Sequence, residues 1–568
     1  MCKTNLTTKI TKKHKGKHRI FIGFFLIPLI IFLFALSARL IPGPRTIDDS
    51  FITYRYARNI LAGEGFVYNP GEQVLGTTTP LYTLTLVAVG TFAGGTQANF
   101  PVIAQLINAL ADALTALLLW KLGVRLGYKI AGAAAALVWA SAPFSVTFAI
   151  GGLETSLYVL LLTAAVYTHI QNQHKLTAFL AALSLLTRPD ALLLLGPLAI
   201  ARLIPHVTDR TSLPAPRSPR SVLRPPSSVL LELLAFILPT AAWLTFATLY
   251  FGSPIPHSIL AKSLAYRLPD TAALIRLLQH YATPFLGHLT FGIPWIGIGL
   301  VIFPFFFAIG ARAALKASPR LWPWVIYPWL YFAVFAIANP LIFRWYLTPP
   351  LPAYIFFILL GMEHFVGTIT KRADAPAGPQ SWRVRMNQIL LPLVILFPLA
   401  LTLRGWTLTP DHGPSRPAPE MAWHKLELLY RQSADILNDE IADDASPIPL
   451  LAAGDVGVLG FYTPTRILDT VGLNSPQSLE YYPLDESFYA INYAIPPDLI
   501  HDQQPDYVII LEAYGRDGLL KERRFENSYS LLHKISTDIY GSDGMLIFER
   551  IPNYSLRYFT HPNIAFLR

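Results

Sequence analysis

Charge and cysteine are both scarce in this chain of 568 residues. Only 14% of the residues are Asp, Glu, Lys or Arg, against roughly 25% in soluble domains, and 53% are hydrophobic. This composition excludes an ordinary soluble protein. A single cysteine, Cys2, excludes a disulfide-stapled fold and any cysteine-based zinc or iron–sulfur site. The 47 prolines suit kinked membrane helices better than a soluble core.

Cofactor motifs are missing as well. The chain has no HExxH motif, no tight His/Asp cluster and no GxGxxG motif, and the GDVG segment at 454–457 is too short to indicate a nucleotide site. The sequence therefore predicts no firm metal or cofactor site. The adjacent Asp48 and Asp49 could still bind a divalent cation (Mg, Mn or Ca), because such hard cations take oxygen ligands.

The net charge of +10 is divided unevenly along the chain. Residues 1–403 carry a net charge of +20, and residues 404–568 carry −10. The division predicts a basic, apolar body (1–405) followed by an acidic, water-soluble domain (406–568), rather than a nucleic-acid-binding protein.

The body contains apolar stretches long enough to cross a bilayer, which takes roughly 20 helical residues. The fifth and sixth stretches are short and could form one broken helix, and a signal peptide is a rival interpretation of the first. Eleven spans are expected at 20–41, 100–120, 130–149, 155–171, 176–187, 190–204, 229–250, 285–310, 321–339, 349–367 and 388–405.

The distribution of Lys and Arg predicts the orientation of these spans. With eleven spans, the connecting loops alternate between the two sides of the membrane. The side that holds the N-terminal tail carries 23 Lys and Arg residues, and the other side carries nine. The positive-inside rule then predicts a cytoplasmic N-terminus and an extracytoplasmic C-terminal domain in the plasma membrane. Because a further span at 80–95 would invert this pattern, that stretch is expected to lie at the outer interface or to be re-entrant.

The first outer loop (42–99) combines carboxylates with guanidinium groups. Asp48 or Asp49 is expected at the N-cap of a helix over 50–62, where helix N–H groups favour a carboxylate. Arg55 and Arg58 share one face of that helix. The segment predicts either a catalytic base beside a phosphate clamp, or an N-cap with arginines that reach lipid headgroups.

The run DDSFITYRYARNILAGEGFVYNPGEQVLGTTTPLY (48–82) resembles the first extracytoplasmic loop of GT-C superfamily glycosyltransferases, and in particular the mycobacterial arabinofuranosyltransferase type. The family pattern often has Asn where His257 stands, so the resemblance does not fix the sugar. Further matching segments occur in chain order at 151–155, 186–190, 250–262, 344–347, 454–462 and 468–473.

The resemblance implies a polytopic α-helical GT-C membrane protein with about 11 transmembrane helices and a C-terminal extracytoplasmic α/β domain. It implies transfer of a sugar from a polyprenyl-phosphate donor to a cell-envelope glycan, lipid or protein. In this reading Asp48 or Asp49 is the catalytic base. The donor phosphate would contact Arg55, Arg58, Lys262 and Arg344, and the substrate groove would include Glu154, Arg188, Asp190 and His257. Adjacent aspartates make a poor acid–nucleophile pair, which favours single-step inversion.

Other interpretations stay open. Arg188 and Asp190 could form a structural ion pair, and Asp112, midway along the second span, could be functional or simply paired, for instance with Asn108. At the level of the whole protein, the alternatives are a lipid-linked oligosaccharide ligase or polymerase and, less favoured, a secondary transporter.

The C-terminal domain is expected to be α/β. A helix is predicted over 418–442 and strands over 449–453, 507–511 and 545–548. The tyrosine-rich run at 481–493 is expected either to pack against the membrane body or to stack on sugar rings.

Overall fold

The computed structural model describes residues 26–203, 226–372, 380–410, 413–422, 424–442 and 446–551. The described chain divides into two compact units. Unit 1 comprises residues up to Thr53 together with Thr78–Pro254 and Pro269–His424. Unit 2 comprises Tyr54–Thr77, Ile255–Leu268 and Lys425–Arg568, so it includes two segments that the sequence analysis assigned to the body.

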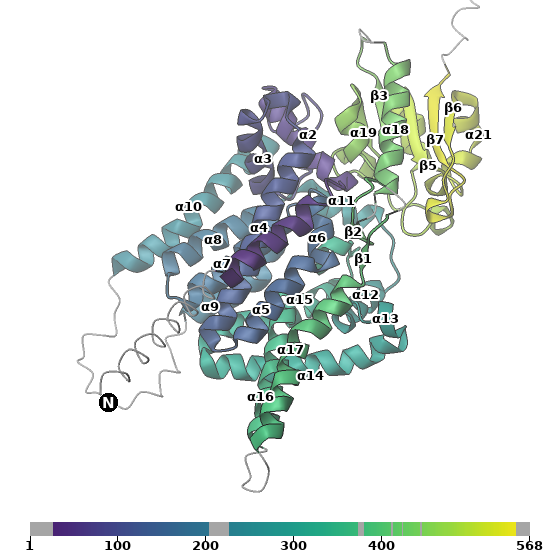
Figure 1. Ribbon diagram of the computed structural model, residues 1–568. Helices are drawn as coiled ribbons and strands as arrows, with labels where there is room; N and C mark the ends of the chain where they lie inside the picture. Colours follow the sequence, from purple (N-terminus) through teal and green to yellow (C-terminus); the bar gives the residue numbers. More distant parts are fainter. Residues whose placement is uncertain are drawn as a thin grey trace, which may run out of the picture. The chain divides into compact units, whose positions relative to one another are not determined.

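Unit 1 is helical (Figure 1). Its first described helix is Leu26–Leu40. The shared α2 (Asp48–Leu61) begins in this unit. The remaining longer helices are α3 (Pro80–Phe92), α4 (Phe100–Leu126), α5 (Lys129–Ser141), α6 (Pro143–Ile150), α7 (Thr155–Ile170), α8 (His174–Thr187), α9 (Leu192–Leu203), α10 (Pro226–Phe251), α12 (Ala272–Ala282), α14 (Pro294–Ala317), α15 (Trp322–Ala338), α16 (Leu351–Arg372) and α17 (Gln380–Leu403).

Fewer than eleven of the described helices meet the length and composition criteria for crossing a membrane, so the count of eleven spans stays a prediction. Among the described residues, five helices are long and apolar enough to cross, and α5 with α6, bent by 43° at Ala142, would make a sixth. Five further apolar helices are shorter. A helix is present in the described part of each predicted span, while residues 20–25 and 204 lie outside the described residues. The eighth begins at Pro294 rather than at 285, because the short α13 (His288–Phe291) and Gly292 precede it.

Asp112 in α4 is buried in an ion pair. Its Oδ2 lies 3.0 Å from Arg39 Nε and accepts a 3.0 Å hydrogen bond from Ser156 Oγ. Arg39 also donates to Ser145 and to the backbone carbonyls of α5. The partner of Asp112 is therefore Arg39, whereas Asn108 bonds to the carbonyls of Ala149 and Leu153. A buried charge needs an opposite charge beside it, and Arg39 and Asp112 supply this to each other. The pair therefore has a structural role, because it links the helix Leu26–Leu40 to α4.

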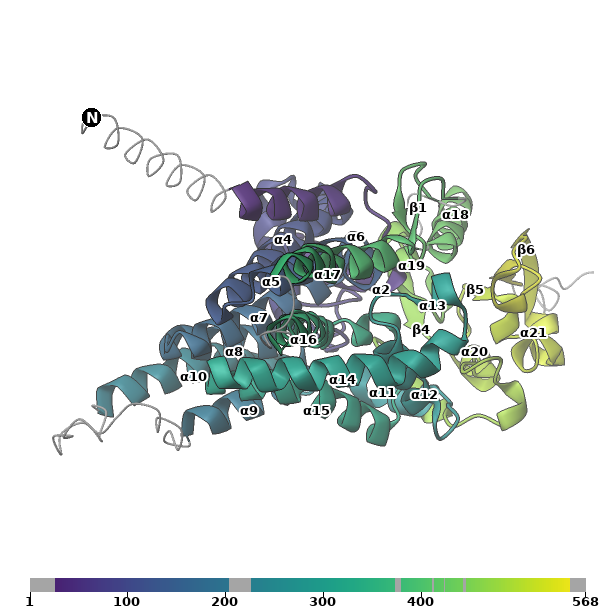
Figure 2. The same ribbon diagram turned by 60° about the horizontal axis from the view of Figure 1, so that its bottom comes forward.

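A pair of glycines lets α14 and α16 cross closely (Figure 2). A Cβ on Gly310 would collide with the carbonyl oxygen of Phe357, and one on Gly361 would collide with that of Phe306. The two backbones can approach this closely only because neither residue has a side chain.

Unit 2 contains a mixed five-stranded sheet in the order β4-β3-β5-β7-β6. The strands β3 (Leu450–Ala453), β4 (Arg466–Asp469) and β5 (Tyr507–Leu511) are parallel, and β7 (Met545–Arg550) runs antiparallel between β5 and β6 (Tyr529–Ile535). The helices of this unit include α11 (His257–Ala265), α18 (Lys425–Glu440), α19 (Gly457–Tyr462), α20 (Pro497–Gln503) and α21 (Arg523–Ser528).

Two details of the C-terminal prediction need correction. The helix expected over 418–442 begins only at Lys425, because Ala418–Pro419 (β2) pairs instead with Trp406–Thr407 (β1) in a two-stranded ladder. The predicted strands match β3, β5 and β7. In the tyrosine-rich run, Tyr482 and Tyr493 are buried inside unit 2, a packing that neither predicted alternative included.

One buried carboxylate, that of Asp469, holds the loop after β4 in place through hydrogen bonds. Asp469 accepts hydrogen bonds of 3.0 Å from the backbone N–H groups of Val471 and Gly472, and its second oxygen accepts 2.8 and 3.2 Å bonds from Asn474. Burial raises the pKa of Asp469 to about 6, although these hydrogen bonds oppose the shift.

Candidate functional site

The predicted acidic pair opens a helix. Asp48 and Asp49 form the first turn of α2, so the helix begins earlier than predicted and neither aspartate is the residue preceding it. Asp48 is 7% exposed, and Asp49 is more accessible. Carboxylates at this end are stabilised by the helix dipole.

Backbone hydrogen bonds fix this turn against the loop that precedes α7. Ile47 N donates to the carbonyl of Gly151 over 3.0 Å, and Arg45 N donates to that of Ile150 over 2.9 Å. A side chain at position 151 would collide with Ile47, so Gly151 permits the approach. The structure therefore joins the Asp-Asp segment to the Gly151–Thr155 segment, which are about 100 residues apart in the sequence.

Glu154, Arg188 and Asp190 come together at the end of that loop. Arg188 Nε lies 3.0 Å from Asp190 Oδ1 and its Nη2 lies 3.0 Å from Oδ2, so this pairing is bidentate. Its Nη1 lies 3.4 Å from Glu154 Oε1. Three of the four predicted groove residues thus form one cluster, in which Arg188 is only 3% exposed.

Tyrosines enclose this cluster. The guanidinium of Arg188 lies 5.2 Å from the ring centroid of Tyr158 and 4.7 Å from that of Tyr346. Tyr331 donates from its hydroxyl to Asp190 over 3.2 Å and to the carbonyl of Tyr346 over 2.7 Å. The sequence analysis missed Tyr158 and Tyr331, since buried aromatics inside apolar helices carry no local signal.

Glu154 connects the cluster electrostatically to the acidic pair. Burial raises the pKa of Glu154, and the negative charges of Asp190 and Asp49 add to the rise, while Arg188 opposes it. A buried carboxyl with a raised pKa beside a cation is a frequent feature of active sites.

A cavity of about 830 Å³ in unit 1 is lined by Arg344. Arg276 also lines it, and both guanidiniums are exposed. Glu420 is the acidic residue of its lining, and the walls include Ile275 and Leu289. Two cations beside apolar walls suit an anionic group attached to a lipid. Because Tyr346 of the same turn packs against Arg188, the turn Arg344–Leu347 contacts both the cavity and the cluster.

His280 faces this cavity from α12. It is 3% exposed, and among the described residues neither ring nitrogen has a partner of hydrogen-bond geometry. Burial lowers the pKa of His280 to about 3, with Arg276 adding to the effect and the carbonyl of Leu347 opposing it. The lowered pKa favours the neutral form of the ring. Arg276 and His280 were not predicted, although the amphipathic pattern of 272–282 could have indicated them.

The other predicted phosphate ligands have structural partners in unit 2. Arg55 is buried and donates to the carbonyls of Tyr68, Gly460 and Thr465, at 2.8 Å for Tyr68 and 3.0 Å for Thr465. Arg58 donates to the carbonyl of Phe461 over 2.7 Å. These bonds disfavour the predicted clamp, because the guanidinium donors already bind the protein backbone.

His257 and Lys262 belong to α11, which is also in unit 2. The backbone N–H of His257 donates to the carbonyl of Leu75 over 2.8 Å. Burial lowers the pKa of its ring. Their predicted roles in substrate binding remain predictions. Within the described residues, no group of three or more His, Cys, Asp or Glu side chains could hold a metal ion.

The fold of this chain is similar to that of two solved proteins. ArnT from Cupriavidus metallidurans, solved with undecaprenyl phosphate, aligns with a TM-score of 0.52 at 13% identity, covering 94% of this chain and 99% of that one. The Archaeoglobus fulgidus oligosaccharyltransferase aligns with a TM-score of 0.52 at 12% identity, covering 92% and 74%. The chain is a multi-pass membrane protein with the GT-C fold.

Sequence comparison confirms the particular resemblance. Two curated proteins named terminal β-(1→2)-arabinofuranosyltransferase match, one from Mycobacterium tuberculosis (29% identity over 38% of this chain) and one from Corynebacterium glutamicum (27% over 63%). The matched segments span 35% and 49% of those relatives. Residues 420–554 match a family model described as a domain of unknown function (DUF8728).

Proposed function

We propose that this protein is an inverting membrane glycosyltransferase, which moves a sugar from a polyprenyl-phosphate donor to an acceptor outside the cytoplasm. The observation that carries the proposal is the acidic first turn of α2, whose preceding residues Arg45 and Ile47 hydrogen-bond to the loop that leads into the Glu154–Arg188–Asp190 cluster. The GT-C fold and the two arabinofuranosyltransferase relatives support it.

In the proposed reaction, Asp48 or Asp49 takes the proton of an acceptor hydroxyl as its oxygen attacks the anomeric carbon. The bond from that carbon to the donor phosphate breaks, and the polyprenyl phosphate leaves with the electron pair. One displacement inverts the anomeric centre, and no protein nucleophile is required.

The leaving phosphate needs cations more than a proton donor. Arg344, with Arg276 and the neutral ring of His280, supplies donors beside apolar walls in the 830 Å³ cavity. A lipid phosphate fits this combination, because its head is anionic and its tail is apolar. Undecaprenyl phosphate in the ArnT structure supports a donor of this class.

The experiment compares Asp48→Asn and Asp49→Asn in lipid nanodiscs supplied with a polyprenyl-phosphosugar. Loss of the base should lower kcat by about 10² to 10⁴-fold in one of the two variants, because general base catalysis contributes that much. The exposed Glu64→Gln is the control and should keep full turnover. Full turnover in both aspartate variants would refute the base assignment.

The size of the transferred group is a separate question. The fold is shared with an oligosaccharyltransferase as well as with ArnT, so a lipid-linked oligosaccharide ligase or polymerase is the second candidate. Parallel assays with monosaccharide and oligosaccharide lipid donors separate the two. Binding and transmembrane release of donor without sugar transfer would instead indicate a transporter.

A further inference from the structure

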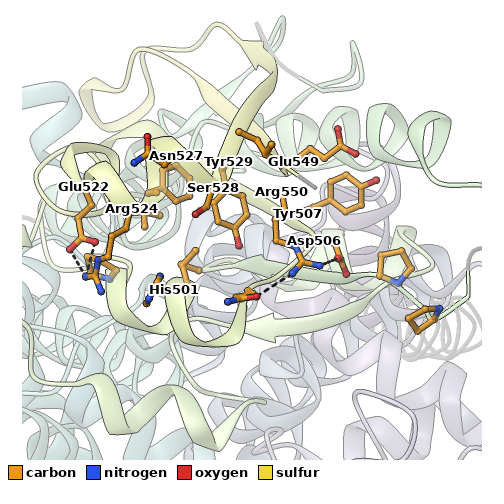
Figure 3. Close-up of a pocket in the computed structure, with 18 residues that line it drawn as sticks. His501, Asp506, Tyr507, Glu522, Arg524, Asn527, Ser528, Tyr529, Glu549 and Arg550 are labelled. Carbon is orange, nitrogen blue, oxygen red and sulfur yellow. Dashed lines mark hydrogen bonds and ion pairs between the residues drawn. The ribbon is translucent and has the colours of Figure 1, made fainter. Parts of the chain in front are cut away.

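Unit 2 contains a cavity of about 730 Å³ at one end of its sheet (Figure 3). It lies at the beginning of β5 and the end of β7, bordered by α20 and α21. Ligands of α/β sheets gather at the carboxyl ends of the parallel strands, and this cavity lies at the opposite end. Its volume is within the range of ligand pockets.

The floor of the cavity is aromatic and its rim is polar. Tyr507, Phe525 and Tyr529 are buried beneath it, and Tyr529 is fixed by a 2.9 Å hydrogen bond from its hydroxyl to the carbonyl of Pro505. His501 and Asn527 are among the exposed rim residues. This combination offers ring faces below a ligand and hydrogen-bonding groups around it.

The guanidinium groups of the cavity are already neutralised. Arg550 Nη2 lies 2.7 Å from Asp506 Oδ1. Arg524 Nη2 lies 2.7 Å from Asp498 Oδ1 and 2.9 Å from Glu522 Oε2. Figure 3 shows the Arg524–Glu522 pair on one side of Tyr529 and the Arg550–Asp506 pair on the other. With Glu549 added, the lining carries no excess of positive charge, which disfavours phosphate or another anion.

We propose that this cavity binds a neutral saccharide. Sugar hydroxyls both donate and accept hydrogen bonds, so they match a rim of paired carboxylates, guanidiniums and amides, and the apolar face of a sugar ring packs on an aromatic floor. The identification of this saccharide as the glycan acceptor rests on the proposed function; the binding itself does not.

The test measures binding to the full chain in nanodiscs without any lipid donor, so that no turnover can occur. The probe is a neutral arabinofuranosyl oligosaccharide, titrated by calorimetry. Asn527→Trp places an indole in the cavity and should weaken binding about tenfold or more, a loss comparable to one or two hydrogen bonds. Glu526→Trp is the matched control, because it is exposed on the same helix and does not line the cavity.

Each outcome bears on the proposal. Weaker binding in Asn527→Trp, unchanged binding in Glu526→Trp and no competition by inorganic phosphate would support it. His501→Ala gives a second, smaller perturbation with the same expected direction. Absence of binding, equal binding in both tryptophan variants or competition by phosphate would overturn it. If the protein binds the saccharide but transfers no sugar from any lipid donor, the proposed transferase activity is refuted and the saccharide-binding proposal stands.

Discussion

At the scale of single residues, partners distant in the sequence decide what a motif does. Arg55 and Arg58 have the spacing of a phosphate clamp, but their donors bind backbone carbonyls about 400 positions away. Local pattern carries no information on such partners. The Arg188–Asp190 pair could be predicted because its members are two positions apart. The addition of Glu154, 34 positions earlier, depended on the resemblance.

Asp469 gives a prediction on pH dependence. Its pKa is about 6 when folded and roughly 3.9 when unfolded, so the folded state binds the proton more tightly. Its contribution to the free energy of unfolding is therefore present below pH 4 and is lost as the pH rises to about 6. The expected loss is about 3 kcal/mol.

The measurement is thermal unfolding between pH 4 and pH 7, as the difference between wild type and Asp469→Asn. This difference should change across the interval, whereas the exposed Glu526→Gln should give a constant difference. A pH-independent difference for Asp469→Asn would contradict the raised pKa.

At the scale of elements, periodicity predicted the helices and strands well, and their ends less well. The buried run 507–511 matches β5, because a short, fully apolar segment rich in β-branched residues has few alternatives. The start of α18 was missed because β2 is formed through pairing with β1, 12 positions earlier. Helical periodicity in a sequence does not predict which residues pair with one another as β-strands.

The crossing of α14 and α16 gives a second prediction. Gly310→Ala introduces a methyl group against the carbonyl of Phe357, and relief requires the helices to separate. Overpacking of this kind costs about 1 to 3 kcal/mol. The thermal midpoint in detergent should fall accordingly.

Gly297→Ala is the control for that substitution. It lies in the same helix and has open space around its Cα, so it should leave the midpoint unchanged or raise it slightly through better helix propensity. Equal midpoints for the Gly310 and Gly297 variants would refute the close crossing.

At the scale of the whole molecule, unit 2 is built from three separated segments. Asn69 shows how the first is held: its Nδ2 donates to the carbonyl of Ile467 over 2.9 Å, and its Oδ1 accepts from the N–H of the same residue over 3.1 Å. The side-chain amide of Asn69 thus binds the backbone of β4 at the edge of the sheet, as a neighbouring strand would. Composition predicted an acidic C-terminal domain, but it could not assign this loop to it.

Asn69→Asp tests that assembly. A carboxylate accepts but cannot donate, so the carbonyl of Ile467 loses its partner, at a cost of about 1 to 3 kcal/mol. Limited proteolysis followed by mass spectrometry should show faster cleavage within 425–551. Glu64→Gln, exposed in the same segment, should leave the cleavage rate unchanged, and equal rates for both variants would refute the link.

The bond between Asn69 and Ile467 also has a consequence for biosynthesis. A ribosome makes Asn69 398 positions before its partner, so this bond cannot form until residue 467 has been synthesised and has left the ribosome. Assembly of unit 2 should consequently follow the synthesis of residue 467, and nascent chains released before that residue should be open to quality-control proteases.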